Sequence, residues 1–165
     1  MPDHEADHID FIIGQWQQER PDLSAAPMAI IGRVKRLHTH LRHDIEAKHR
    51  EYGLAWGEFD VLATLLRSGQ PYCLTPTVLF RSAMLSSGAM TNRLNKLEER
   101  GLIERLPDPE DRRSLLVRLT DSGYRLISDA ITEHVELEQQ LISMLDEQEQ
   151  ETLNSMLKKW LAAFE

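Results

Sequence analysis

The chain has 165 residues, with 19 lysines and arginines against 27 aspartates and glutamates, and a formal net charge of −8. A length suited to one domain, together with 41% apolar and 28% charged residues, is ordinary for a globular protein and argues against wholesale disorder. No apolar run approaches the ~18–20 residues of a membrane-spanning helix, and the acidic N-terminus is unlike a signal peptide. A single cysteine, Cys73, excludes an internal disulfide. We therefore expect a cytoplasmic protein with no membrane partner.

Apolar residues at helical spacing predict three helices in the first part of the chain. The first ends before Pro21, and its apolar stripe consists of Ile9, Ile12, Ile13 and Trp16. The second begins near Pro27 and ends near Gly53, because glycine readily supplies a helix stop. The third spans about residues 57–67, before a loop signal at 68–71.

The middle of the chain has shorter predicted elements, both helices and strands. Thr75 and Pro76 are typical of a helix N-terminus, and the helix that they open ends near residue 82. A further helix over 87–100 carries a stripe of three apolar residues, Met90, Leu94 and Leu97, and ends at Gly101. Two β-like runs, 102–106 and 115–119, flank a polar tip with two prolines, which predicts a hairpin.

The tail returns to helix. Thr120 suits an N-cap, and Asp146 begins a capping-box pattern for a last helix. The apolar stripe of this last helix contains Leu153, Met156, Leu157, Trp160, Leu161 and Phe164. Because so wide a stripe must be covered, we expect it to pack against the apolar faces of residues 9–16 and 31–45.

A helix, a turn, a second helix and a basic-tipped hairpin are the order of a winged helix-turn-helix, so the predicted fold is mainly α with a small β-wing. Residues 81–118 hold eight basic and six acidic side chains, so this window is net positive while the whole chain is acidic. A local positive patch is enough for nucleic acid binding. The sequence therefore predicts that helix 87–100 enters a major groove of double-stranded DNA.

The residues expected to contact DNA lie on the polar side of that helix and at the hairpin tip. Asn92 and Asn95 suit adenine edges, and Arg112 and Arg113 suit phosphates or the minor groove. The remaining candidates suit phosphates or bases: Ser86, Ser87, Gly88, Thr91 and Lys96.

The stretch from Ser86 to Arg105, followed by Asp111-Arg112-Arg113 and Leu119-Thr120-Asp121-Ser122-Gly123, resembles the MarR family of bacterial transcriptional regulators over about residues 30–160. The resemblance implies a single subunit over 1–165, with a DNA-binding lobe at 54–119 and helical dimerisation regions at 6–52 and 120–165. It further implies a homodimer that reads a pseudo-palindromic operator, with half-sites about 34 Å apart. In the family a wing arginine contacts DNA and a neighbouring aspartate braces the wing; these positions fall on Arg112/Arg113 and on Asp108/Asp111.

A narrower resemblance is to the urate-responsive branch of the same family, and it rests on residues 15–23, 32–37 and 59–63. It implies a repressor released by a small anionic ligand that packs near Trp16, competes for Arg93 and displaces Asp60 from that arginine. The residues alone support this only in part. Arg93 lies at the edge of the buried stripe and needs a partner, but periodicity places Asp60 on an exposed face, and Trp16 could simply pack with Ile12 and Ile13.

Other interpretations stay open. The effector could be a phenolic or aromatic acid, or an oxidant acting at Cys73, although nothing basic adjoins this cysteine to lower the pKa of its thiol. The chain could instead be a helical interaction module that binds no DNA. The sequence predicts no enzyme, no catalytic residues, no cofactor and no metal site, because the histidines lack the spacing of a ligand set.

Overall fold

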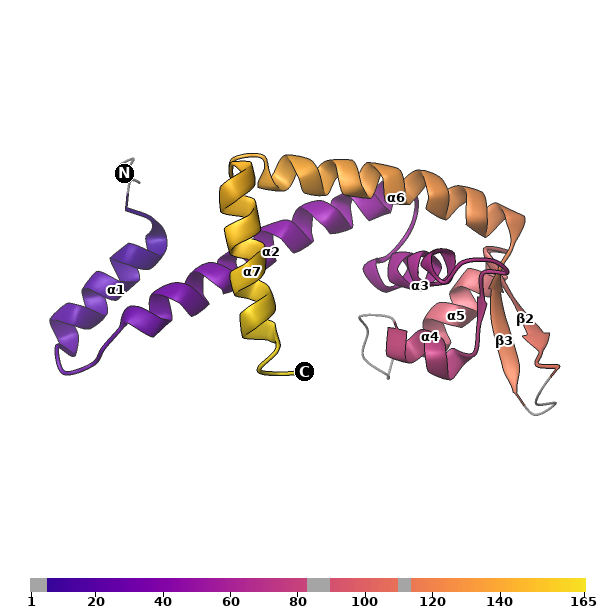
Figure 1. The fold of residues 1–165 in the computed structure, drawn as a ribbon, viewed down its shortest axis with the longest axis horizontal. Coiled ribbons are helices and arrows are strands. Elements are labelled where there is room, and N and C mark those ends of the chain that lie inside the picture. Colours follow the sequence, from indigo (N-terminus) through magenta and orange to yellow (C-terminus); the bar gives the residue numbers. More distant parts are fainter. Residues whose placement is uncertain (1–5, 83–89, 110–113) are drawn as a thin grey trace. The chain divides into compact units, whose positions relative to one another are not determined.

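The computed structural model describes residues 6–82, 90–109 and 114–165. Within these residues the fold is mainly helical with one small antiparallel sheet (Figure 1), as the sequence predicts. The chain divides after Asp44 into two compact units. None of the described helices is both long enough and apolar enough to cross a bilayer.

The first unit contains α1 (His8–Glu19) and the beginning of α2 (Ala26–Glu51), the helix that continues into the second unit. Asp7 caps α1 in a reciprocal capping box with Asp10. Arg33 of α2 binds both carboxylates, at 2.8 Å from Asp7 Oδ2 and 2.7 Å from Asp10 Oδ1, and these contacts hold the pKa of Asp7 at about 2. The start of α1 is thus fixed onto α2 by charge as well as by the buried Ile9.

The second unit contains the last turns of α2 and the following elements in chain order: α3 (Trp56–Arg67), β1 (Cys73–Leu74), α4 (Pro76–Ser82), α5 (Met90–Glu99), β2 (Ile103–Pro107), β3 (Leu115–Leu119), α6 (Asp121–Ile142) and α7 (Glu147–Leu161). The predicted hairpin is confirmed, because β2 pairs with β3 from Ile103 opposite Leu119 to Pro107 opposite Leu115. The sequence missed β1, which pairs with β3 at Cys73–Arg118 and Leu74–Val117 and makes the strand order β1-β3-β2.

The core of the second unit is built mostly from leucine, and it lies between α3, α5, the sheet and the first half of α6. The largest fully buried side chains are Leu54, Leu62, Leu65, Leu79, Leu97, Ile103, Ile127, Val61 and Val117. Each buried leucine or isoleucine stabilises the fold by about 1.5–3 kcal/mol relative to an exposed one. The core therefore fixes α5 and the hairpin on one scaffold.

The junction between the sheet and α6 is tightly packed. Thr120 caps α6 by accepting from the Gly123 N–H, and its own N–H donates to the Leu102 carbonyl at 3.2 Å. Gly123 lies against the same carbonyl: a Cβ built at this position would be 1.9 Å from the Leu102 oxygen. Only glycine lets the first turn of α6 approach the strand backbone this closely.

A buried aromatic cluster joins the end of α2 to α3 and α6. His49, only 2% exposed, stacks on Phe59 with ring centroids 3.7 Å apart, and its Nε2 lies 3.3 Å from His134 Nδ1. Lys48, one residue earlier, reaches Glu133 of α6 at 3.2 Å. Burial, with the nearby His134, lowers the pKa of His49 to about 4, against a smaller opposing effect of Glu46.

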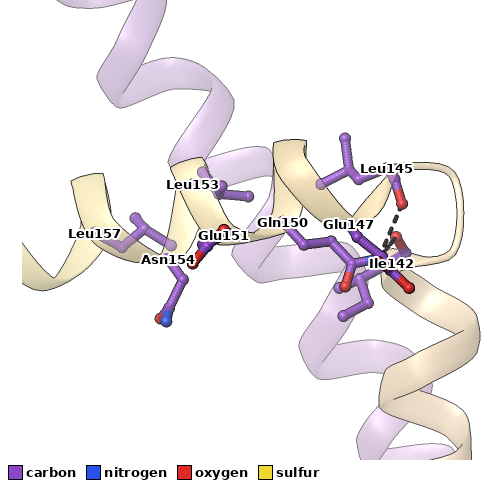
Figure 2. A pocket seen from close by; sticks show the side chains of 8 residues that line it. All are labelled: Ile142, Leu145, Glu147, Gln150, Glu151, Leu153, Asn154 and Leu157. Carbon is purple, nitrogen blue, oxygen red and sulfur yellow. Dashed lines mark hydrogen bonds between the residues drawn. The ribbon is translucent and has the colours of Figure 1, made fainter.

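The last helix has no buried residue within its own subunit. Its predicted apolar stripe is exposed, with Met156 64% and Phe164 78% accessible. Between the end of α6 and α7 a groove of about 560 Å³ has a partly apolar lining that includes Ile142, Leu145, Leu153 and Leu157 (Figure 2). In the turn between the two helices, the Leu145 carbonyl accepts a hydrogen bond from Gln150 Nε2 at 2.9 Å. The second unit therefore leaves this stripe uncovered, and its packing against residues 9–16 and 31–45 stays a prediction.

Candidate nucleic-acid interface

Helix α5 separates an apolar face from a polar one. Met90, Leu94 and Leu97 are buried in the core, as their spacing predicts. The four polar candidates on this helix are all exposed: Thr91, Asn92, Asn95 and Lys96. Ser86, Ser87 and Gly88, which the sequence also nominates, lie outside the described residues. The described part of α5 thus presents amides, a hydroxyl and an ammonium group to solvent.

The C-terminal end of α5 is anchored to the turn between α2 and α3. Arg100 donates from Nη1 to the Gly53 carbonyl at 3.0 Å and to Glu58 Oε2 at 3.3 Å. Glu58 is buried and also accepts from the Ala55 N–H at 3.0 Å, so one carboxylate caps α3 and holds Arg100. Gly101 has a φ of +67° and ends the helix before β2, as predicted.

The hairpin extends the same surface as a wing. At the end of the described strands nearest the tip, Asp108 donates its N–H to the Ser114 carbonyl at 3.1 Å, and Asp108 is half-buried. Arg112, Arg113 and Asp111, the predicted DNA-contacting and bracing residues, lie outside the described residues. A helix with an exposed polar face and an adjacent strand pair are the two parts that a winged helix-turn-helix presents to a duplex.

A model of the MarR family matches residues 52–114 of the chain. The HTH-type transcriptional regulator PecS from Dickeya dadantii is 38% identical to it over 149 residues, which cover 90% of each protein. The chain belongs to the MarR family.

Solved structures of MarR proteins share the fold. A mutant MarR from E. coli in complex with operator DNA has 26% identity and a TM-score of 0.69, and the match covers 88% of this chain and 97% of that one. AbsC, a MarR family transcriptional regulator from Streptomyces coelicolor, has a TM-score of 0.77 at 20% identity over 86% of this chain and 96% of that one, and it supports the fold alone. The predicted winged helix-turn-helix is thus confirmed for this MarR-family chain.

The residues predicted to sense a ligand are distributed over both units. In the second unit, Arg93 of α5 packs over Gly57 at the start of α3: a Cβ at Gly57 would lie 2.2 Å from Arg93 Nε. Nη1 of Arg93 is buried, and among the described residues no acceptor binds it. Asp60 lies one helical turn after Gly57, so α3 brings this carboxylate to the turn on which Arg93 rests. An ion pair between Asp60 and Arg93 stays a prediction.

Periodicity was wrong about Asp60, which is half-buried with a buried Oδ2. The apolar spacing identifies only the face of α3 that meets the core. On the adjacent face the Arg93 side chain covers Gly57. Asp60 lies one turn further along α3 and is half-buried. Contacts of this kind depend on the side chains of the partner helix, so the spacing of apolar residues in α3 cannot predict them.

Trp16 lies in the first unit, on α1, and is 40% exposed. The neighbouring groove between α1 and α2, of about 550 Å³, is lined on α1 by His8, Ile9, Ile12 and Ile13 and does not include Trp16. Trp16 is thus more exposed than Ile12 and Ile13, which are half-buried. Its predicted role in ligand binding stays a prediction.

The structure bears on the thiol of Cys73 and on the histidines that it describes. Cys73 is half-buried in β1, and burial raises the pKa of its thiol, which disfavours the reactive thiolate at neutral pH. Within the described residues no group of three or more histidine, cysteine, aspartate or glutamate side chains could hold a metal ion.

The sequence did not predict a role at this interface for three residues that shape it: Gly57, Arg100 and Arg105. Gly57 makes room for Arg93, and Arg100 anchors the end of α5. Arg105 in β2 donates to Asn95 of α5. Each acts on a residue that is distant in sequence, so only an expected three-dimensional arrangement could have nominated it.

Proposed function

We propose that this chain is a transcriptional regulator that binds double-stranded operator DNA as a homodimer. One observation carries the proposal: α5 buries its apolar stripe in the lobe and leaves Thr91, Asn92, Asn95 and Lys96 exposed beside the wing. A helix of this kind fits the major groove, and its amides match the donor and acceptor pattern of base edges.

Two further facts support DNA as the partner. The net positive charge is concentrated between residues 81 and 118, in a chain whose total charge is −8. A related MarR with 26% identity has been crystallised with operator DNA. On an acidic protein, a local cationic surface attracts DNA phosphates to that surface, while the negative charge of the rest of the protein repels DNA.

The homodimer is supported by α7. A monomer would leave the whole apolar stripe of α7 in water, together with the groove of Figure 2. A patch of this kind favours burial against a second copy, and a twofold axis then sets two wings on a pseudo-palindromic site. The exposed apolar residues of α1 and α2, such as Phe11 and Ile30, add to the surface available for this contact.

The test of DNA binding is a titration of labelled duplexes from the region upstream of the gene at several salt concentrations. We expect Arg112→Ala/Arg113→Ala to weaken binding roughly tenfold or more. The slope of the logarithm of the binding constant against the logarithm of the salt concentration should become less negative by about one unit for each phosphate that the variant no longer neutralises. Lys158→Ala/Lys159→Ala is the matched control, because it removes the same charge from exposed positions on α7 outside its apolar stripe. Size-exclusion chromatography checks that this variant keeps the oligomeric state of wild type, and the variant should then change neither value. Wild-type protein that shifts no duplex from this region would favour the interaction module instead.

We further propose that a small anionic ligand, with urate as first choice and a phenolic or aromatic acid as second, releases the DNA by binding at Arg93. The buried Nη1 of Arg93 supports an anion at this position. The described residues offer this donor no acceptor, which costs about 1–3 kcal/mol, and an anion would remove that cost. Urate comes first because of the resemblance to the urate-responsive branch. Arg93 lies on α5 itself, so a ligand there would act on the helix that enters the groove.

Urate should therefore release the duplex from wild-type protein, and Arg93→Gln should raise the urate concentration for half-release roughly tenfold or more, since it removes a charge-assisted contact. Trp16→Phe tests the second predicted contact and should also weaken the response. A Trp16→Phe protein that responds like wild type would remove this tryptophan from the mechanism. Release by an aromatic acid, with no response to urate, would assign the second ligand class.

A further inference from the structure

Arg105 links the wing to the DNA-facing side of α5. From its place in β2, its Nη2 donates to Asn95 Oδ1 at 2.7 Å, and its Nη1 forms an ion pair with Glu98 at 2.5 Å. Asn95 and Glu98 are one helical turn apart, so a single guanidinium spans both. The side chain of Arg105 is only 22% exposed, and the contact with Glu98 holds it in place.

The contact with Arg105 determines which way the Asn95 amide faces. Arginine has five N–H donors and no acceptor, so only the carbonyl oxygen of an amide can face it. The Nδ2 group of Asn95 must then point away from Arg105, and Asn95 as a whole is exposed on α5. The orientation of this amide is thus fixed before any DNA is bound.

The fixed amide changes the base edge that Asn95 can read. An asparagine that reads adenine accepts from N6 through its Oδ1 and donates to N7 through its Nδ2. Oδ1 has two lone pairs, and Arg105 occupies one of them. The guanidinium beside this oxygen, with its bulk and positive charge, disfavours the approach of an adenine amino group, so Nδ2 is left as the group that faces the groove. The matching edges are acceptors: N7 and O6 of guanine, and O4 of thymine.

We propose that Arg105 determines the DNA specificity of Asn95, by making it a donor that selects an acceptor edge instead of an amide that reads adenine through two bonds. This inference rests on the proposed function and adds to it a residue that touches no base. Asn92 offers a contrast on the same helix, because within the described residues its exposed amide has no hydrogen-bond partner and keeps both groups for adenine.

The experiment is selection of binding sites from a randomised duplex library with the full-length chain, compared across variants by the base frequencies at each position. Arg105→Met keeps the stem and removes the guanidinium. We expect one position in each half-site to lose its preference for guanine or thymine by roughly fivefold or more, with the other positions unchanged. Thermal unfolding checks that the variant is folded.

The matched control is Arg118→Met. Arg118 lies on β3 directly opposite Glu104 of β2, and its Nη2 is 2.7 Å from Glu104. The change therefore also removes one charge and one ion pair from the wing. No hydrogen bond or ion pair in the described part of the chain joins Arg118 to α5. Its selected site should match that of wild type at every position.

Asn95→Asp tests the same idea at an exposed position where the fold is not at risk. One carboxylate oxygen should keep the contact with Arg105, and the other presents an acceptor in place of the amide donor. The same position should then change its preference to a base with an amino group, cytosine or adenine.

The outcomes separate the two proposals. Wild-type protein that enriches no sequence contradicts the proposed function, and this inference with it. A wild type that enriches a motif, with unchanged base frequencies for Arg105→Met or Asn95→Asp, overturns this inference alone. Weaker binding of Arg105→Met at all sequences, with the motif unchanged, also overturns it, because a phosphate contact or a structural role would give that result.

Discussion

We expect Gly123→Ala to destabilise the second unit by about 3 kcal/mol or more, which corresponds to a decrease of roughly 6–12 °C in Tm. The added Cβ would lie 1.9 Å from the Leu102 carbonyl oxygen, and both the helix turn and the strand end are backbone that cannot rotate away. The clash would also disturb the hydrogen bond in which the Thr120 N–H donates to the same oxygen. Thermal and urea unfolding, followed by circular dichroism, measure the effect.

Gly14→Ala is the matched control, because it adds the same methyl group in the middle of α1, where nothing lies within 4 Å of the new Cβ. Replacing glycine by alanine within a helix stabilises it by about 0.5–1 kcal/mol. Equal stabilities for wild type and Gly123→Ala would show that α6 can move away from the sheet at no cost, contrary to the packing described above.

Acid should destabilise the protein through His49. The pKa of His49 is about 4 in the folded chain and 6.5 in the unfolded chain, so the unfolded chain binds more protons between these values. The contribution of His49 is complete above pH 6.5 and is lost as the pH falls towards 4. Lowering the pH from 7 to 5 should therefore reduce the free energy of unfolding by about 2 kcal/mol. Urea unfolding across this range measures it.

Carboxylates titrate in the same range, so the comparison needs variants. His49→Leu should be less stable than wild type at pH 7, because it removes the stacking on Phe59, but its stability should fall less between pH 7 and 5. His43→Leu, at an exposed position, should keep the pH dependence of wild type. Identical slopes for wild type and His49→Leu would assign the acid sensitivity to other groups.

The elements that the sequence predicted correctly are those whose signal is local. The stripes of α3, α5 and α7 repeat every three to four residues, and Thr120 and Asp146 cap their helices as their residue types suggest. Strand β1 was missed because two residues are too few to show an alternation. Its register comes from β3, more than 40 residues away in sequence.

The interface was predictable only in outline for the same reason. The exposed face of α5 follows from the burial of its three apolar residues. The contacts that orient individual side chains on this face come from other elements: Arg105 reaches Asn95 from β2, and Arg93 crosses to Gly57 on α3. Such contacts join residues that are not related by helical or strand spacing. The sequence could therefore predict that Asn95 and Arg93 matter, but not which residues contact them.

The lack of any buried residue in α7 has a consequence for how the chain folds. A helix of 15 residues is marginal in water by itself, and most helical stability in proteins comes from packing. The C-terminal segment of a solitary subunit should accordingly be largely unstructured, and pairing with a second copy would be the step that orders it. The amount of protein in the cell would then govern how much of the chain is folded, and a dilute regulator would lose its ordered tail together with its partner.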